Sequence, residues 1–211
     1  MITNINKSKY IDLIENLKKD RQIINKTLST LENPKTGIII LGDNNVDLVK
    51  EKIVKSKSGN GEYRVRVLKT EDRNITTIYS IFPEHIVVWP IDFLFGGSSY
   101  PYIILIKHHA IYRYAERYLK IDNIDLESVL TRFIDVFCLR KDPVMIKKSE
   151  TDKVDSLMCR IKEGALLGYS YKVSPGILRF NTFVSDKELE ETNRIDQKII
   201  RVNSNAWKKV Q

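Results

Sequence analysis

The hydrophobic positions near the start of the chain recur at alternating steps of four and three residues. The stripe comprises Tyr10, Ile14, Leu17, Ile24, Leu28 and Leu31, and Arg21 interrupts it once. This spacing places all of them along one side of an α-helix, so it predicts a helix from Lys9 to Glu32 that ends at Asn33-Pro34. Two interpretations stay open: the helix packs on its own domain, or Tyr10 to Leu31 forms a helical contact in a homodimer.

Between residues 37 and 89 the pattern changes to short apolar runs and period-two alternation, which predicts a small mixed sheet under this helix. Strands are expected at Gly37–Leu41, Tyr63–Val67, Thr76–Ile81 and His85–Trp89. The segment Val46 to Val54 fits a short helix or a strand, and Lys55 to Gly61 fits a flexible basic turn. Together these elements form an expected N-terminal subdomain over residues 1–95.

The stretch from Phe95 to Pro101 marks the sharpest change in composition, because two glycines, two serines and a proline fall within it. Such a stretch predicts a boundary, and a second domain is expected over residues 100–211. Its pattern predicts a strand, two helices and three strands in the order Tyr102–Ile106, His109–Leu119, Asp125–Phe137, Ser156–Lys162, Leu166–Val173 and Ile177–Val184. A capping box at Ser185-Asp-Lys-Glu188 predicts a closing helix from Asp186 to about Arg201.

The predicted fold class is therefore α+β. An N-terminal helix with a small mixed sheet is followed by a strand-helix-helix unit with a three-stranded antiparallel sheet, and a C-terminal helix closes the chain.

Charge and cysteine content narrow the function classes. The 211 residues include 35 Lys and Arg against 27 Asp and Glu, a net charge of +8 with an isoelectric point near 9.3. This excess favours an anionic partner, RNA or DNA. The longest apolar run covers about seven residues where a membrane helix needs about twenty, so no membrane partner is expected. Cys138 and Cys159 have no close Cys or His spacing, so we expect no metal, no cofactor and a reducing cytoplasmic setting.

The segment from His109 to Arg117 carries the most chemistry in the sequence. On a helix, the side chains that fall on one stripe, opposite an apolar side, are His109, Arg113, Glu116 and Arg117. Metal-independent RNA cleavage needs a general acid or base near neutrality and cations for the phosphorus oxygens. His109 suits the first role, Arg113 and Arg117 suit the second, and Glu116 could orient them or act as the base. The same spacing also suits salt bridges on a solvated helix face.

The string His-Ala-x-x-Arg-x-x-Glu-Arg from His109 to Arg117, with the order of elements over residues 100–185, resembles the BrnT-like branch of the RelE-type ribonuclease toxins. The resemblance implies a compact α+β domain, metal-independent cleavage of RNA and a small antitoxin partner. It also implies that His109, Arg113, Glu116 and Arg117 are the catalytic positions. Residues 1–95 have no counterpart in that small fold.

Basic and aromatic side chains on the predicted strands support a second hypothesis. In it the chain is a non-catalytic module from a mobile element or phage that binds RNA, DNA or another protein. The candidate nucleic-acid-binding residues are Arg64, Arg66, Arg160, Lys172 and Arg179, with Tyr112, Tyr169 and Tyr171 nearby in the sequence. Cations contact phosphates and aromatic rings stack on bases, although solvated sheet faces use the same residue types. His85 is expected on a sheet face and His108 at the surface.

Overall fold

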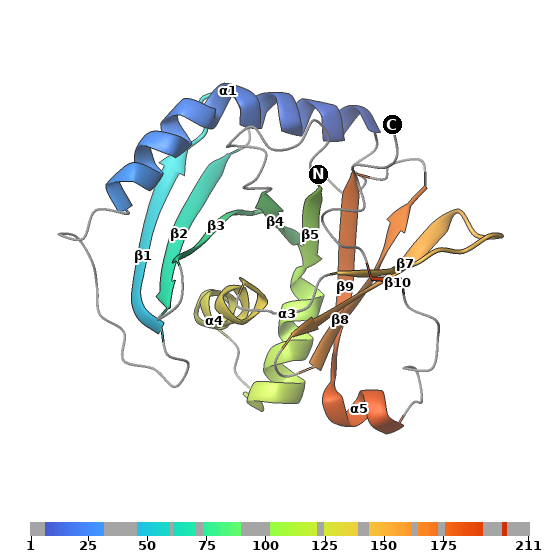
Figure 1. The fold of residues 1–211 in the computed structure, drawn as a ribbon. Coiled ribbons are helices and arrows are strands. Elements are labelled where there is room, and N and C mark those ends of the chain that lie inside the picture. The colour runs from blue at the N-terminus through green and yellow to red at the C-terminus, as the bar shows by residue number, and fades with distance from the viewer. Residues whose placement is uncertain are drawn as a thin grey trace. The chain divides into compact units, whose positions relative to one another are not determined.

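A computed structural model describes residues 7–31, 46–59, 61–70, 74–89, 102–121, 125–138, 144–161, 164–172, 176–191 and 200–201. The chain divides into two compact units, residues 1–104 and 105–211 (Figure 1). Both units combine helices with antiparallel strands, so the predicted α+β class is confirmed. The predicted strand at Gly37–Leu41 and the glycine-rich stretch from Phe95 to Pro101 lie outside the described residues.

The first unit is a long helix followed by an antiparallel meander of four strands. The elements are α1 (Lys7–Leu31), β1 (Val46–Lys55), β2 (Glu62–Thr70), β3 (Asn74–Ile81) and β4 (His85–Trp89), and each strand pairs with the next. The segment that fits a helix or a strand in the sequence is thus strand β1. Its apolar and charged residues alternate less regularly than those of β2, which explains why the pattern left both interpretations open.

The apolar stripe of α1 is buried within the chain. Its buried members are Ile14, Leu17, Ile24, Leu28 and Leu31, whereas Arg21 is exposed. The helix packs against β1 and β2, where Tyr63, Val65 and Val67 are also buried. This arrangement agrees with the interpretation in which the helix lies on its own domain. Removal of these side chains from water stabilises the unit by about 25 cal/mol for each Å² of apolar surface.

A buried carboxylate on α1 fastens the helix to the β1–β2 turn. Asp20 accepts hydrogen bonds from the hydroxyls of Ser56 and Ser58, both at 2.5 Å, from the backbone N–H of Lys57 at 3.0 Å and from the hydroxyl of Tyr63 at 3.0 Å. Ser58 also donates to the backbone carbonyl of Asn16 at 2.8 Å. The side chains of this turn therefore bind it to α1, so the prediction of a flexible turn was wrong. The sequence pattern could not show this contact, because Asp20 and Ser56 are 36 residues apart.

The second unit contains β5 (Ile103–Lys107, which begins in the first unit), α3 (His108–Tyr114), a π-helical turn η1 (Ala115–Leu119), α4 (Leu126–Cys138), β6 (Met145–Lys147), β7 (Val154–Ile161), β8 (Gly164–Tyr171), β9 (Ile177–Ser185), α5 (Asp186–Glu191) and β10 (Ile200–Arg201). Antiparallel pairing joins β9, β8, β7, β6 and β10 in that order. The three predicted strands are confirmed as β7, β8 and β9.

The predicted closing helix begins where the sequence places it but does not reach Arg201. Helix α5 starts at Asp186, whereas Ile200 and Arg201 form strand β10, which pairs with Ile146 and Met145 of β6. Neither β6 nor β10 was predicted, because strands of two and three residues are too short to show a period.

Aromatic residues join the helices of the second unit to its sheet. The ring of Tyr114 lies edge-on to Phe133 of α4 and to Phe183 of β9, with centroid distances of 5.3 Å in both cases. The opposite face of the strands carries a smaller apolar cluster in which Leu189 of α5 packs with Ala165 and Val184. Both faces of β8 and β9 are thus covered at this end of the strands.

A bulge interrupts the pairing of β8 with β9. Leu167 pairs with Thr182 and Gly168 with Phe180, which leaves Asn181 as the extra residue. Gly168 sits so close to β9 that a Cβ atom at this position would overlap the backbone carbonyl of Arg179. Only glycine therefore fits this register.

Candidate nucleic-acid interface

Helix α3 presents two of the predicted catalytic residues on its exposed side. It begins directly after the extended Lys107, and Ala110, Ile111 and Tyr114 are buried along one side of it. His109 is exposed and Arg113 is partly exposed. The helix therefore has the predicted orientation at these positions, with an apolar side inward and a polar side outward.

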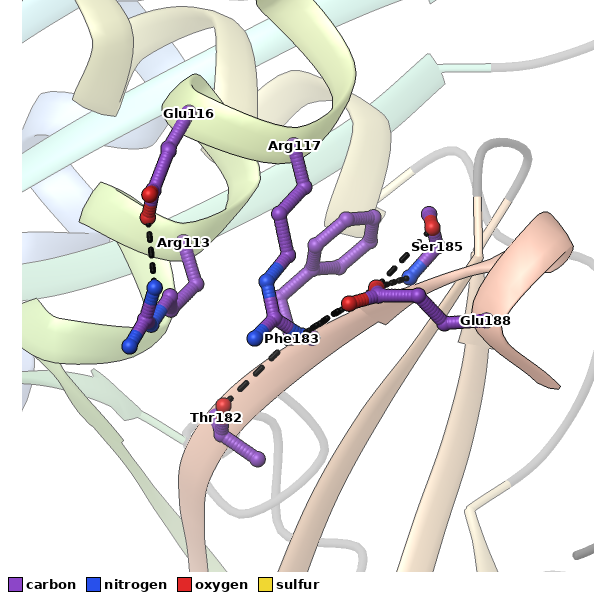
Figure 2. A network of polar contacts seen from close by, with 7 residues as sticks. All are labelled: Arg113, Glu116, Arg117, Thr182, Phe183, Ser185 and Glu188. Atoms are coloured by element: carbon purple, nitrogen blue, oxygen red, sulfur yellow. Dashed lines mark hydrogen bonds and ion pairs between the residues drawn. The ribbon is translucent and has the colours of Figure 1, made fainter. Parts of the chain in front are cut away.

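Three residues of the predicted catalytic stripe, Arg113, Glu116 and Arg117, do not meet at one point (Figure 2). Arg113 forms an ion pair with Glu116, with Nη1 and Oε2 2.7 Å apart. Arg117 instead extends to β9 and α5, where it donates to the carbonyl of Phe183 at 3.0 Å and pairs with Glu188 at 3.0 Å. The spacing in the sequence could not reveal this, because Glu188 is 71 residues further along the chain.

Glu188 is the centre of the contact between η1, β9 and α5. Its carboxylate accepts hydrogen bonds from the backbone N–H and the hydroxyl of Ser185 at 3.0 and 2.9 Å, and the first of these is the Glu188 half of the predicted capping box. Burial alone would raise the pKa of Glu188, but the Ser185 hydrogen bonds and the Arg117 charge outweigh it and hold the pKa below its ordinary value. Arg117 thus braces the fold of the second unit.

The neighbouring histidines differ in their surroundings. His108 is half-buried at the start of α3, and its Nε2 atom is buried with no hydrogen bond to any described residue. Burial lowers the pKa of His108, because the charged imidazolium loses its hydration. His108 is therefore only partly exposed at the surface where it was expected, whereas His85 lies buried on β4 as expected for a sheet-face residue. Within the described ranges, no three His, Cys, Asp or Glu side chains are grouped as metal ligands.

The candidate cations of the first unit lie around one carboxylate. Arg66 lies opposite Glu51 in the β1–β2 pairing and forms an ion pair with it at 3.0 Å, and Arg64 approaches the same carboxylate at 3.9 Å. Tyr79 of β3 donates a hydrogen bond to Glu51 at 3.1 Å. Burial and the Glu51 charge both raise the pKa of Tyr79, so its hydroxyl stays protonated and remains a donor. Arg66, a candidate nucleic-acid-binding residue, is thus only 5% exposed, with its guanidinium paired to Glu51.

Two of the candidate cations of the second unit also have partners within it. Arg160 of β7 pairs with Asp186 at the start of α5, at 2.9 Å, and both side chains are partly exposed. Lys172 donates from Nζ to the backbone carbonyl of Ser149. Ion pairs this exposed contribute little to stability and can exchange partners at small cost.

The last candidate, Arg179, belongs to a cluster with two tyrosines. Arg179 of β9 lies opposite Tyr169 of β8, and its Cζ atom is 5.0 Å from the centre of the Tyr171 ring. The rings of Tyr169 and Tyr171 are 5.2 Å apart and inclined by 75°. Burial lowers the pKa of Arg179, which the two tyrosines partly offset, and an arginine remains charged at neutral pH in any case. We call Tyr169, Tyr171 and Arg179 the tyrosine–arginine cluster.

The sequence analysis named all three residues but did not predict that they meet. The i, i+2 spacing of Tyr169 and Tyr171 on a strand places them on one face, and this signal was available. The approach of Arg179 depends on the β8–β9 register, which the bulge at Asn181 sets. A turn of different length would have placed another residue opposite Tyr169.

No helix of the described parts is both long and apolar enough to cross a membrane. Comparison of the chain with protein-family models, with curated proteins and with solved structures gives no match.

Proposed function

We propose that the chain binds nucleic acid through the tyrosine–arginine cluster of its second unit. The observation that carries the proposal is the position of the Arg179 guanidinium over the Tyr171 ring, beside Tyr169. Aromatic rings stack on bases, and an arginine held against a ring can contact a phosphate or stack on a base itself. These three side chains therefore combine the two kinds of contact that nucleic acids require.

The overall charge supports an anionic ligand. The chain has a net charge of +8, and residues on both sides of position 95 contribute to the excess. Long-range attraction of this kind increases the rate of association with a polyanion and makes binding sensitive to salt. The cytoplasmic setting expected from the cysteine content is compatible with RNA or DNA as the ligand.

Fluorescence anisotropy with a labelled RNA 20-mer tests the proposal. Saturable binding at low salt is expected, and Arg179→Met should weaken it and reduce the dependence of log K on log salt by about one unit, as for the loss of one phosphate contact. Arg132→Met is the matched control, because Arg132 is an exposed arginine on α4 of the same unit. The absence of saturable binding to RNA and to DNA would refute the proposal.

The exposed position of His109, one helical turn before Arg113, favours a second candidate function. In it the chain is a metal-independent endoribonuclease of toxin-like type, with a small antitoxin as its partner. His109 would move the proton and Arg113 would contact the phosphate, while Arg117 and Glu116 would hold the helix in place. Because Arg113 is paired with Glu116, its guanidinium is not free for a phosphate unless that pair breaks. Cleavage is therefore the second candidate, after nucleic-acid binding without catalysis.

Incubation with mixed RNA in EDTA tests cleavage, because chelation removes metal-dependent contaminants. The wild-type chain should cleave, His109→Ala should not, and Tyr112→Ala should cleave normally, since Tyr112 is an exposed residue of the same helix. Equal cleavage by the wild type and His109→Ala, or none by either, would refute this second function.

A further inference from the structure

We infer that the tyrosine–arginine cluster accepts single-stranded nucleic acid, which crosses the sheet from β6 to β9 with its bases unpaired. This inference rests on the proposed function and narrows its ligand. It follows from the register of four strands and from the inclination of the two tyrosine rings.

The strand register places a row of four polar or aromatic side chains across the sheet. Lys147 of β6 pairs with Ser156 of β7, Ser156 pairs with Tyr169 of β8, and Tyr169 pairs with Arg179 of β9. Directly opposed residues of antiparallel strands share a face of the sheet. A cation thus stands at each end of the row, and a tyrosine lies between them.

The length of this row suits a short piece of nucleic-acid strand. Neighbouring strands are about 4.8 Å apart, so Lys147 and Arg179 begin about 14 Å apart at the backbone. In a stacked duplex strand this distance corresponds to about four nucleotides, at about 3.4 Å each. An extended strand spans the same distance with two or three nucleotides and brings a base over the middle of the row.

The middle of the row is open to such a base. Ser156 is exposed and has a small side chain, so the β7 side of Tyr169 carries no large neighbour at the directly opposed position. Tyr169 and Tyr171 are each partly exposed. A flat ring with an open flank on a sheet face is the usual platform for an unpaired base.

The inclination of the two rings excludes a continuous base stack. Their planes differ by 75°, so bases stacked on Tyr169 and on Tyr171 would be steeply inclined to each other. Successive bases of a duplex lie nearly parallel and cover each other's faces. Because the Arg179 guanidinium already lies over the Tyr171 ring, the ring left for a base is Tyr169, and only an unpaired, unstacked base of a single strand can place its face on it.

Competition anisotropy with full-length protein tests the inference with three unlabelled probes of one sequence: a 12-nucleotide RNA strand, the DNA strand and the RNA duplex. Both single strands should compete at least tenfold better than the duplex. Tyr169→Leu should weaken single-strand binding roughly tenfold, the effect of losing one stacked base, whereas Tyr169→Phe should retain it. Lys147→Met should weaken single-strand binding severalfold, with a smaller salt dependence.

Tyr112→Leu is the matched control, because it removes an exposed tyrosine from α3 without touching the sheet. Circular dichroism of each variant distinguishes a lost contact from a lost fold. If Tyr169→Leu unfolds, Tyr169→Phe still tests stacking, because its ring can stack on a base and binding should be retained. Equal or better competition by the duplex, or unchanged binding after folded Tyr169→Leu, overturns the inference while the proposed function stands. Failure of every probe to bind refutes the proposed function itself. A difference between the RNA and DNA strands identifies whether the 2′-hydroxyl is recognised.

Discussion

Each unit of the chain fastens a helix to neighbouring strands through one carboxylate, but the two carboxylates have different surroundings. Asp20 in the first unit is 2% exposed, and all four groups that donate to it are neutral hydroxyls or a backbone N–H. Glu188 in the second unit is 35% exposed and is bound by the cation Arg117 as well as by Ser185. The first contact is a buried hydrogen-bond centre, and the second is a partly hydrated ion pair.

This difference separates two ways to stabilise a contact between distant segments. A carboxylate taken out of water must recover its lost hydration from fixed donors, and Asp20 does so with four of them. A carboxylate that keeps part of its hydration needs less from its partner, and salt weakens its attraction to a cation. The first unit should therefore depend strongly on one residue, and the second unit only weakly.

The largest effect is expected for Asp20→Ala. Without the carboxylate, the hydroxyl of Tyr63 and the donors of the β1–β2 turn lose their acceptor, which should lower the free energy of unfolding of the first unit by about 3 kcal/mol. In a Trp207→Phe background, the fluorescence of Trp89 reports this unit, because Trp89 packs against Tyr63. The melting temperature should fall by at least about 10 °C.

Asp12→Ala is the control, because Asp12 is an exposed aspartate of the same helix. If the two substitutions lowered the melting temperature equally, Asp20 would not be the centre of the contact and the comparison between the units would fail.

A smaller effect is expected from acid. Hydrogen bonds outweigh burial and hold the pKa of Asp20 below its ordinary value of 3.8, and the pKa of Glu188 likewise lies below 4.5. An unfolded chain then binds more protons than the folded one, so the stabilisation is complete above these values and is lost as pH falls through the folded pKa. Below pH 4.5 the second unit should begin to lose protection, and the first unit should follow below pH 3.8.

Hydrogen exchange measured by mass spectrometry between pH 3 and 5, corrected for the intrinsic exchange rate, resolves the two units. Asp20→Asn should remove the acid-dependent step from peptides of α1 and β2 alone. A step that persists in those peptides would assign the titration to another group.

The smallest effect is expected for Glu188→Gln. The amide keeps a similar shape but loses the charge that attracts Arg117, so the second unit should lose about 1 kcal/mol at low salt and less at 1 M NaCl. Glu116→Gln breaks the exposed Arg113 pair instead and should cost at most about 0.5 kcal/mol. Urea unfolding at both salt concentrations compares them, and a salt-independent loss for Glu188→Gln would show that hydration does not moderate this contact.

Local signals in the sequence were sufficient for most elements. The four-and-three spacing of Leu17, Ile24 and Leu28 predicted α1, and alternation predicted β2 and β9. Short runs bounded by turn residues predicted β7 and β8. The capping box from Ser185 to Glu188 predicted the start of α5 because both halves of the contact lie within four residues. In each case the pattern that predicts the element lies within the element itself or directly beside it.

The predictions that failed depend on distant partners. Asp20 and Ser56 are 36 residues apart, and Arg117 and Glu188 are 71 apart, so no local spacing could show that a turn is fastened or that an arginine leaves its stripe. Arg66 fits the pattern of an exposed strand residue, yet it is buried because Glu51 neutralises it from the neighbouring strand. The strand register and the ion pairs between distant residues thus determine which side chains lie together in the candidate site. Both depend on tertiary packing, which local sequence patterns do not show.

The close approach at Gly168 restricts how this surface can evolve. Any side chain at that position would push β8 away from the carbonyl of Arg179 and so separate Arg179 from the two tyrosines. Related proteins that retain the tyrosine–arginine cluster should therefore also retain the glycine immediately before Tyr169. Gly-Tyr-x-Tyr, followed by an arginine eight residues after the second tyrosine, is the signature by which distant kin with the same surface would be recognised.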